Sequence, residues 1–196
     1  MHKILKPTFI LIVITFVVAF SIAMVNYLTK DIINERLAQE ALRQRQQVML
    51  DATKFNDVSH YKSMMSSSKS DIINGIYAGY NGDTLIGYVF SSTPKGYAGN
   101  INVTVGILKN GQISRVVMGE NRETPGLGTL VGEDSFIGQY IGKSIKQNLE
   151  IVKSKPSNDD EIQAVSGATI TSKAINRAVD ASVDFANMLL DNGGDI

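Results

Sequence analysis

The stretch Gln163-Ala-Val-Ser-Gly-Ala-Thr-Ile-Thr-Ser172 leads from a tight turn into a helical pattern. It is rich in small and hydroxyl-bearing residues, namely Ser166, Gly167, Ala168, Thr169, Thr171 and Ser172. Apolar residues then recur at spacings of three and four, at Ile175, Ala178, Val179, Val183, Ala186 and Leu190. Polar residues take the other side, at Asn176, Arg177, Asp180, Asp184 and Asn187. These spacings predict a helix with Thr171 or Ser172 as its N-cap.

Two interpretations of this helix start follow from physical chemistry. The simpler one is a capped helix after a turn. The other is a phosphate site, because a helix start offers free backbone N–H groups and a partial positive charge. Gly167 and Ala168 leave room for a ligand to approach the backbone, and Thr169 is a candidate covalent acceptor.

Composition narrows the chemistry of the chain. The 196 residues carry 19 basic and 19 acidic side chains, and this zero net charge gives no support for nucleic-acid binding. The absence of cysteine excludes disulfides, cysteine catalysis and thiolate-held iron–sulfur clusters. The two histidines, His2 and His60, lie far apart, so we expect no metal site. Any redox chemistry must therefore use a cofactor that needs neither cysteine nor paired histidines.

An uncharged run of 21 residues, from Thr8 to Leu28, lies near the N-terminus. As a helix it would be roughly 31 Å long, which matches a hydrocarbon core of about 30 Å. We predict a retained transmembrane helix over 8–28. The alternative is a cleaved signal peptide, since Ser21-Ile22-Ala23 loosely resembles a cleavage site, but the run is longer than a signal core. Unbalanced lysines at 3 and 6 predict a cytoplasmic N-terminus (residues 1–7) and an extracytoplasmic domain.

The middle of the chain carries strand signals. Apolar alternation over 76–80, 84–90, 101–108 and 113–118, with turns at Asn81-Gly82 and Asn110-Gly111, predicts an antiparallel meander. Together with the later helices this gives an α+β fold, an antiparallel sheet with packed helices. We divide the chain into a helical connector (29–70), one domain (71–192) and a tail (193–196), with a loop over 57–70.

Two loops contain candidate pocket residues. Gly96-Tyr-Ala-Gly99 precedes the third predicted strand, and Tyr97 is a candidate pocket wall or simply part of a turn. Glu123-Thr-Pro-Gly-Leu-Gly128 follows the fourth strand, and its Pro-Gly pair favours a turn. An apolar residue, Leu127, between two glycines is unusual for a plain surface turn.

These two loops and the stretch Ser166-Gly-Ala-Thr-Ile-Thr-Ser172 form three motifs that together resemble those of the FMN-binding domain family. That family includes the G subunit of Rnf electron-transport complexes and the C subunit of sodium-pumping NADH:quinone oxidoreductase. The resemblance implies covalent FMN on Thr169 through a phosphothreonyl linkage, with Ser166, Gly167, Ala168, Thr171 and Ser172 around it. It also implies that Glu123, Thr124 and Leu127 line the isoalloxazine pocket, with Tyr97 beside it. Two positions depart from the family pattern, Gln163 in place of an acidic residue and Asn121 in place of histidine.

The function that the resemblance implies is electron transfer within a membrane complex. We expect an electron-carrier subunit of an ion-translocating ferredoxin:NAD oxidoreductase that is not catalytic alone and has no catalytic residue of its own. Its partners would be the membrane, other subunits of the complex and a flavin transferase during maturation. The alternatives are a tethered FMN-binding sensor or adaptor without turnover and the quinone-reductase C subunit. A structural anchor without cofactor is a third alternative.

Overall fold

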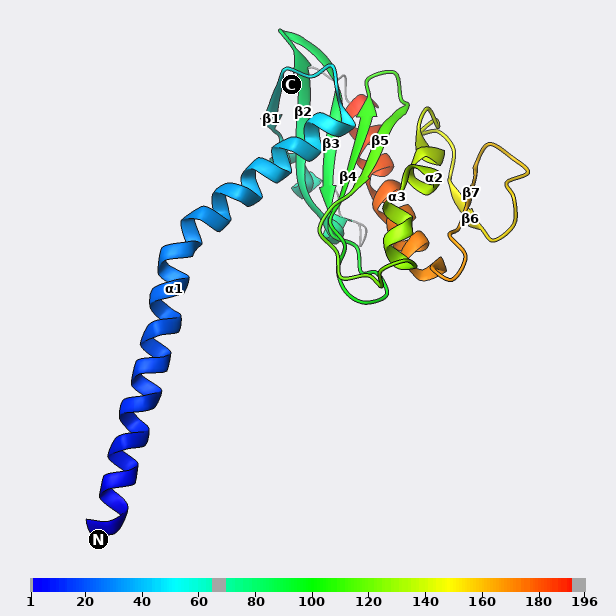
Figure 1. Ribbon diagram of the computed structural model, residues 1–196. Coiled ribbons are helices and arrows are strands. Elements are labelled where there is room, and N and C mark those ends of the chain that lie inside the picture. Colours follow the sequence, from blue (N-terminus) through cyan, green and yellow to red (C-terminus); the bar gives the residue numbers. More distant parts are fainter. Residues whose placement is uncertain (1, 65–69, 192–196) are drawn as a thin grey trace. The chain divides into compact units, whose positions relative to one another are not determined.

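The computed structural model describes residues 2–64 and 70–191 and divides the chain into two compact units, 1–43 and 44–196. Residue 1 of the predicted N-terminus, residues 65–69 of the predicted loop and the predicted tail 193–196 lie outside the described residues. The first unit belongs to one helix, α1 (His2–Val48) (Figure 1). A helix over the predicted span 8–28 is therefore present, and it continues into the predicted connector as far as Val48.

Helix α1 carries the apolar run with its side chains exposed. Its best 18-residue window has a mean hydropathy of 2.8, and none of that window is buried. Phe9, Phe16 and Phe20, for example, are each more than half exposed. Judged by length and composition alone, this helix is the one in the described part of the chain that could cross a membrane. It fits a single-pass membrane anchor.

The second unit is built on a five-stranded antiparallel sheet in the order β1-β2-β3-β4-β5. Its strands are β1 (Lys54–Asp57), β2 (Ile73–Asn81), β3 (Thr84–Ser92), β4 (Val103–Leu108) and β5 (Ile113–Met118). The last four form the meander that the sequence predicts, so the α+β prediction is confirmed. The first hairpin loop is Gly82-Asp83 rather than Asn81-Gly82, because Asn81 pairs with Thr84. Gly82 has φ +59°, which glycine adopts without strain.

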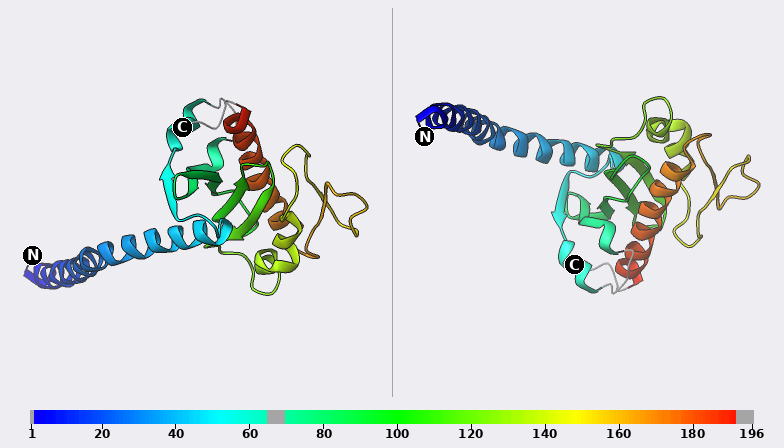
Figure 2. Two further views of the ribbon diagram at one scale, coloured as in Figure 1. Left: turned by 90° about the horizontal axis from the view of Figure 1, so that it is seen from above. Right: turned by 90° about the horizontal axis from the view of Figure 1, so that it is seen from below.

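One face of the sheet is covered by α3 (Thr169–Asp191), which packs against β2, β3 and β4 (Figures 1 and 2). Between them lies the main core, in which Phe90 packs against Phe185. Smaller elements connect β5 to α3. These are η3 (Gly128–Gly132), α2 (Asp134–Ile137), η4 (Gly138–Tyr140) and the parallel pair β6 (Glu150–Val152) and β7 (Glu161–Gln163).

The opposite face of the sheet is covered by the end of α1. Val48, Met49 and Ala52 are buried against Val89, and Thr104 Oγ1 donates to Gln44 Oε1 at 3.0 Å. The predicted connector 29–70 thus contains residues that complete the compact unit, including β1. The helix ends at Val48, and the predicted loop 57–70 holds two 3-10 turns, η1 (Ser59–Met64) and η2 (Ser70–Ile72).

Helix α3 starts three to four residues earlier than predicted. Its first backbone bond runs from Ser172 N to Ala168 O, so Ala168 stands at the N-cap and the prediction of Thr171 or Ser172 was wrong. The apolar face is as expected, but Asn176 is buried instead of facing solvent. Asn176 accepts a hydrogen bond from the Tyr140 hydroxyl at 3.1 Å and donates to Leu149 O at 2.8 Å. Those partners pull a polar side chain inward.

Candidate cofactor-binding site

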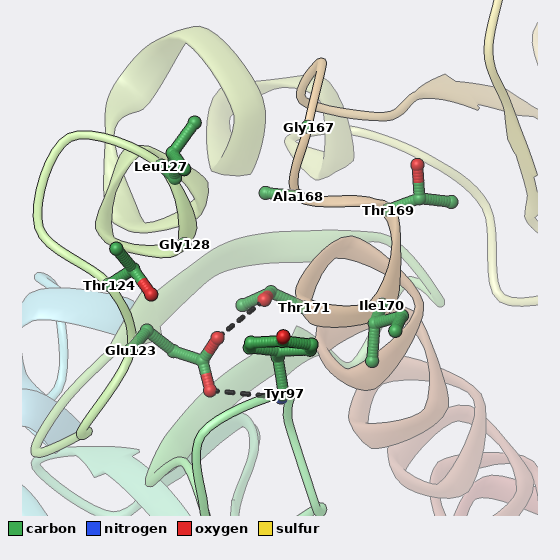
Figure 3. Close-up of a pocket in the computed structure, with 10 residues that line it drawn as sticks. All are labelled: Tyr97, Glu123, Thr124, Leu127, Gly128, Gly167, Ala168, Thr169, Ile170 and Thr171. Carbon is green, nitrogen blue, oxygen red and sulfur yellow. Dashed lines mark hydrogen bonds between the residues drawn. The ribbon is translucent and has the colours of Figure 1, made fainter.

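The three sequence motifs meet around one open pocket of about 440 Å³ (Figure 3). This volume lies within the usual range for small-molecule sites. Eight predicted residues line it: Tyr97, Glu123, Thr124, Leu127, Gly167, Ala168, Thr169 and Thr171. Two further lining residues, Gly128 and Ile170, were missed, although each lies inside a quoted motif. Ser166 and Ser172 were predicted beside the cofactor but do not line the pocket.

Glu123 joins the three motifs. Its side chain is 4% exposed, and its Oε1 accepts hydrogen bonds from the backbone N–H groups of Tyr97 and Ala98, both at 3.0 Å. Its Oε2 accepts the Thr171 hydroxyl at 2.6 Å (Figure 3). Both carboxylate oxygens are thus engaged, so Glu123 lines the pocket while it fixes the two loops against α3.

Two motif glycines are explained by the space that Glu123 needs. A Cβ at Gly96 would lie 2.5 Å from Glu123 Oε1. A Cβ at Gly128 would lie 2.7 Å from both Cβ and Oε2 of Glu123. Real Cβ atoms do not approach other atoms so closely. The Gly-Tyr-x-Gly and Glu-Thr-Pro-Gly-Leu-Gly motifs are therefore coupled sterically through one carboxylate.

The hydroxyl groups at the start of α3 face different surroundings. Thr171 is buried and donates to Glu123. Ser172 is fully buried, donates to Ala168 O at 3.0 Å and accepts from Val165 N at 3.2 Å. Thr169 is half-buried and lines the pocket, and among the described residues its hydroxyl has no hydrogen-bond partner. Figure 3 shows that hydroxyl pointing away from Glu123 and Thr171.

Exposed apolar side chains form the pocket walls. Tyr97 is 70% exposed, Leu127 is 47% exposed and Ile170 is 54% exposed. Leu127 lies against the turn before α3, because a Cβ at Gly167 would lie 3.3 Å from Leu127 Cδ2. Gly167 has φ +79°, which a larger residue would adopt only with strain. Apolar walls that remain open to solvent suit a flat aromatic ligand.

The first turn of α3 adds backbone donors to the apolar walls. Because the first helical bond starts at Ser172 N, the N–H groups of Thr169, Ile170 and Thr171 have no partner within the helix. Free N–H groups at the start of a 23-residue helix favour an anion. The site therefore combines walls for a planar ring with donors for a phosphate, and these features fit the FMN that the motifs suggest.

A second hollow lies on the other side of Ile170. It is lined by Leu149, Glu150, Ile151, Ile170, Lys173, Asn176 and Arg177. Lys173 lies one helical turn beyond Thr169 and is exposed, so it adds a cation near the start of α3. The helical pattern in the sequence places Arg177 on the solvent side and does not single out Lys173. Lys173 could have been predicted near the site from its position four residues after Thr169, which places the two residues on the same side of a helix.

The two positions that depart from the family pattern have structural roles here. Asn121 Oδ1 accepts from Glu123 N at 3.1 Å, and Asn121 Nδ2 donates to Gly119 O, so Asn121 braces the loop. Gln163 is exposed and pairs through its backbone with the Gln139 side chain, outside the pocket. Within residues 2–64 and 70–191, no group of three His, Asp or Glu side chains could hold a metal ion.

Comparison with known proteins gives matches along nearly the whole chain. The FMN-binding domain family matches residues 96–184, and the RnfG N-terminal region family matches residues 1–48. The G subunit of the Na(+)-translocating ferredoxin:NAD(+) oxidoreductase complex of Acetobacterium woodii is 35% identical over 185 residues, 91% of this chain and 89% of that protein. The proton-translocating counterpart of Clostridium ljungdahlii is 34% identical over 169 residues, 86% of this chain and 84% of that protein. NqrC of Shewanella oneidensis is 24% identical, with a TM-score of 0.49 over 60% of this chain and 59% of that one.

Proposed function

The chain belongs to the RnfG family, the G subunits of ion-translocating ferredoxin:NAD(+) oxidoreductase (Rnf) complexes, and we propose that it carries electrons through FMN joined covalently to Thr169. It contains the family's FMN-binding domain, and its relatives are components of oxidoreductase complexes. The finer proposal is the bond, a phosphodiester that would form when the Thr169 oxygen displaces a nucleotide leaving group from the flavin phosphate of an activated flavin nucleotide, with loss of the hydroxyl proton.

The accessibility of the motif hydroxyls carries this proposal. An acceptor hydroxyl must reach both the incoming nucleotide and the pocket that later holds the ring. Thr171 and Ser172 are buried and engaged in hydrogen bonds, and Ser166 does not line the pocket. Thr169 lines the pocket and has a hydroxyl with no partner among the described residues.

The pocket residues then bind and orient the cofactor. FMN, when bound, supplies the capacity to accept and release electrons. Tyr97 and Leu127 provide apolar surface for its ring, and Thr124 offers a hydroxyl to a ring edge. The backbone N–H groups of Thr169 and Ile170, with Lys173 nearby, favour the charge of the phosphodiester. A covalent link keeps the cofactor in place at an open site.

The proposed location follows from α1 and its flanking charges. Lysines 3 and 6 precede the apolar run without any acid, whereas Lys30 and Arg36 follow it beside Asp31 and Glu35. The positive-inside rule then places the N-terminus in the cytoplasm and the FMN-binding domain on the other side. A flavin transferase on that side would be a partner during maturation, and other subunits of the complex would be permanent partners.

The decisive experiment is intact-mass measurement of the protein purified from its native host, in parallel with Thr169→Val and Thr169→Ser. We expect the wild-type chain to weigh one FMN residue more than its amino acids, and Thr169→Val to lose that addition. Thr169→Ser retains a hydroxyl and serves as the matched control. A wild-type chain with the bare mass would refute the covalent proposal, and a Thr169→Val chain that keeps the addition would move the acceptor elsewhere.

Co-purification tests the role as a carrier. We expect the flavin-bearing chain to be isolated with other membrane subunits and to be reduced when the complex receives electrons. A flavin-bearing chain that is isolated alone, and whose flavin is never reduced in membranes, would favour the sensor or adaptor instead.

A further inference from the structure

Glu123 places a buried carboxylate in the wall of the pocket. It accepts three hydrogen bonds, and among the described residues no cationic side chain pairs with it. An acceptor-only arrangement matches the ionised form of a carboxyl group, which has no proton to donate. The hydrogen bonds therefore compensate the burial of the group and leave its negative charge at the pocket.

A fixed charge in a partly buried site acts on a redox cofactor. Each electron that a flavin ring accepts adds one negative charge unless a proton accompanies it. A nearby carboxylate opposes that charge, and the opposition is stronger away from bulk water than in it. Protein groups close to the ring are among the means by which a protein tunes the electronics of a flavin.

We propose that Glu123, which holds the three motifs together, also lowers the reduction potential of the flavin bound in this pocket. The inference rests on the proposed function, because it requires FMN in the pocket. Glu123 is a positioning residue in this account, with an electrostatic effect added. Thr171 moderates that effect, because its hydroxyl donates to the same carboxylate at 2.6 Å.

Two substitutions separate charge from architecture. Glu123→Gln removes the charge but can keep three hydrogen bonds, with its amide oxygen facing Tyr97 N and Ala98 N and its NH2 group facing the Thr171 hydroxyl. Thr171→Val leaves the charge and removes one donor that offsets it. The two changes therefore have opposite electrostatic signs, whereas a merely disordered pocket would shift both potentials in the same direction.

The test is a redox titration of the full-length flavin-bearing protein in detergent, with covalent flavin measured in each sample. We expect Glu123→Gln to favour the reduced flavin at least tenfold, about 59 mV upward for a one-electron couple. Thr171→Val should shift the potential downward. Glu120→Gln, which removes an exposed carboxylate outside the pocket, should leave it unchanged and serves as the matched control.

The outcomes distinguish this inference from the proposed function. If the wild-type protein carries no flavin, the proposed function fails. If flavin is present and Glu123→Gln has the same reduction potential as Glu120→Gln, the electrostatic inference fails and the proposed function stands. Shifts of the reduction potential in the same direction for Glu123→Gln and Thr171→Val would also overturn the electrostatic inference. Should Glu123→Gln lose its flavin, Thr171→Val decides alone, and an unchanged or raised potential rejects the inference.

Discussion

The Thr171 hydroxyl donates to Glu123 Oε2 at 2.6 Å across 48 residues of sequence, and both groups are buried. This contact joins the start of α3 to the loop after β5. It engages the Thr171 hydroxyl, whereas the hydroxyl of half-buried Thr169 has no hydrogen-bond partner among the described residues. Thr171, which the sequence suggests as a helix cap, therefore makes a tertiary hydrogen bond instead.

Thr171→Val should destabilise the domain but keep covalent flavin. The substitution leaves Glu123 with an unsatisfied oxygen, and hydrogen bonds to charged groups contribute roughly 1.5–3 kcal/mol. Denaturant unfolding of the full chain in detergent measures the loss, and intact mass reports the flavin. Thr171→Ser preserves the hydroxyl and should lose much less. Loss of covalent flavin in folded Thr171→Val protein would contradict the assignment of Thr169.

Gly128→Ala should be costly for a steric reason. The added Cβ would lie 2.7 Å from two Glu123 atoms, and overpacking of this kind costs typically about 1–3 kcal/mol. We expect a lower unfolding midpoint and less flavin incorporated per chain. Gly138→Ala is the matched control, because no atom lies within 4 Å of its Cβ and its φ of −62° suits alanine. Equal midpoints for the two variants would show that Glu123 moves aside freely.

The sequence predicts the parts of the fold that depend on local patterns. Alternation and the Asn-Gly pairs locate β2 to β5, and the spacing of three and four locates α3. The strand β1 escapes prediction because Lys54–Asp57 contains one apolar residue, Phe55, and no alternation. Its existence depends on pairing with β2, from Lys54 opposite Tyr80 to Asp57 opposite Tyr77.

The candidate site divides in the same way. The three motifs identify most of the pocket residues, because close approach of a ligand leaves a local signature of glycines and hydroxyls. The hydrogen bond to Glu123 and the burial of Asn176 depend on partners distant in sequence, Thr171 and Tyr140. A periodicity cannot reveal such partners, since it records only which face of a helix a residue occupies.

The chain beginning at Gln44 should fold, whereas the chain beginning at residue 71 should not fold cooperatively. Residues 44–70 supply β1 and cover Val89 with Val48 and Met49, which are 1% and 2% exposed. Each such side chain contributes roughly 1.5–3 kcal/mol on burial. Near-ultraviolet circular dichroism and denaturant unfolding compare the two fragments. A 71–196 fragment as stable as the 44–196 fragment would restore the predicted boundary at 71.

Tyr140→Phe should change how stability depends on alkaline pH. Burial, and next the nearby Asp180 carboxylate, raise the pKa of the Tyr140 phenol well above its ordinary value. The folded state therefore holds this proton more tightly than the unfolded state. The resulting stability is fully present below the ordinary tyrosine pKa of about 10 and is lost as the pH rises above it.

Tyr140→Phe has no such proton. Its free energy of unfolding should therefore fall less than that of the wild-type protein between about pH 9 and about pH 11, a range centred on the ordinary tyrosine pKa of about 10. At neutral pH it should lose about 1–3 kcal/mol, because buried Asn176 Oδ1 loses its donor. Urea unfolding of the full chain in detergent at a series of pH values measures both effects. Tyr97→Phe, at a side chain 70% exposed, is the control and should follow the wild-type protein. Parallel curves for Tyr140→Phe and the wild-type chain would show that another group causes the alkaline loss.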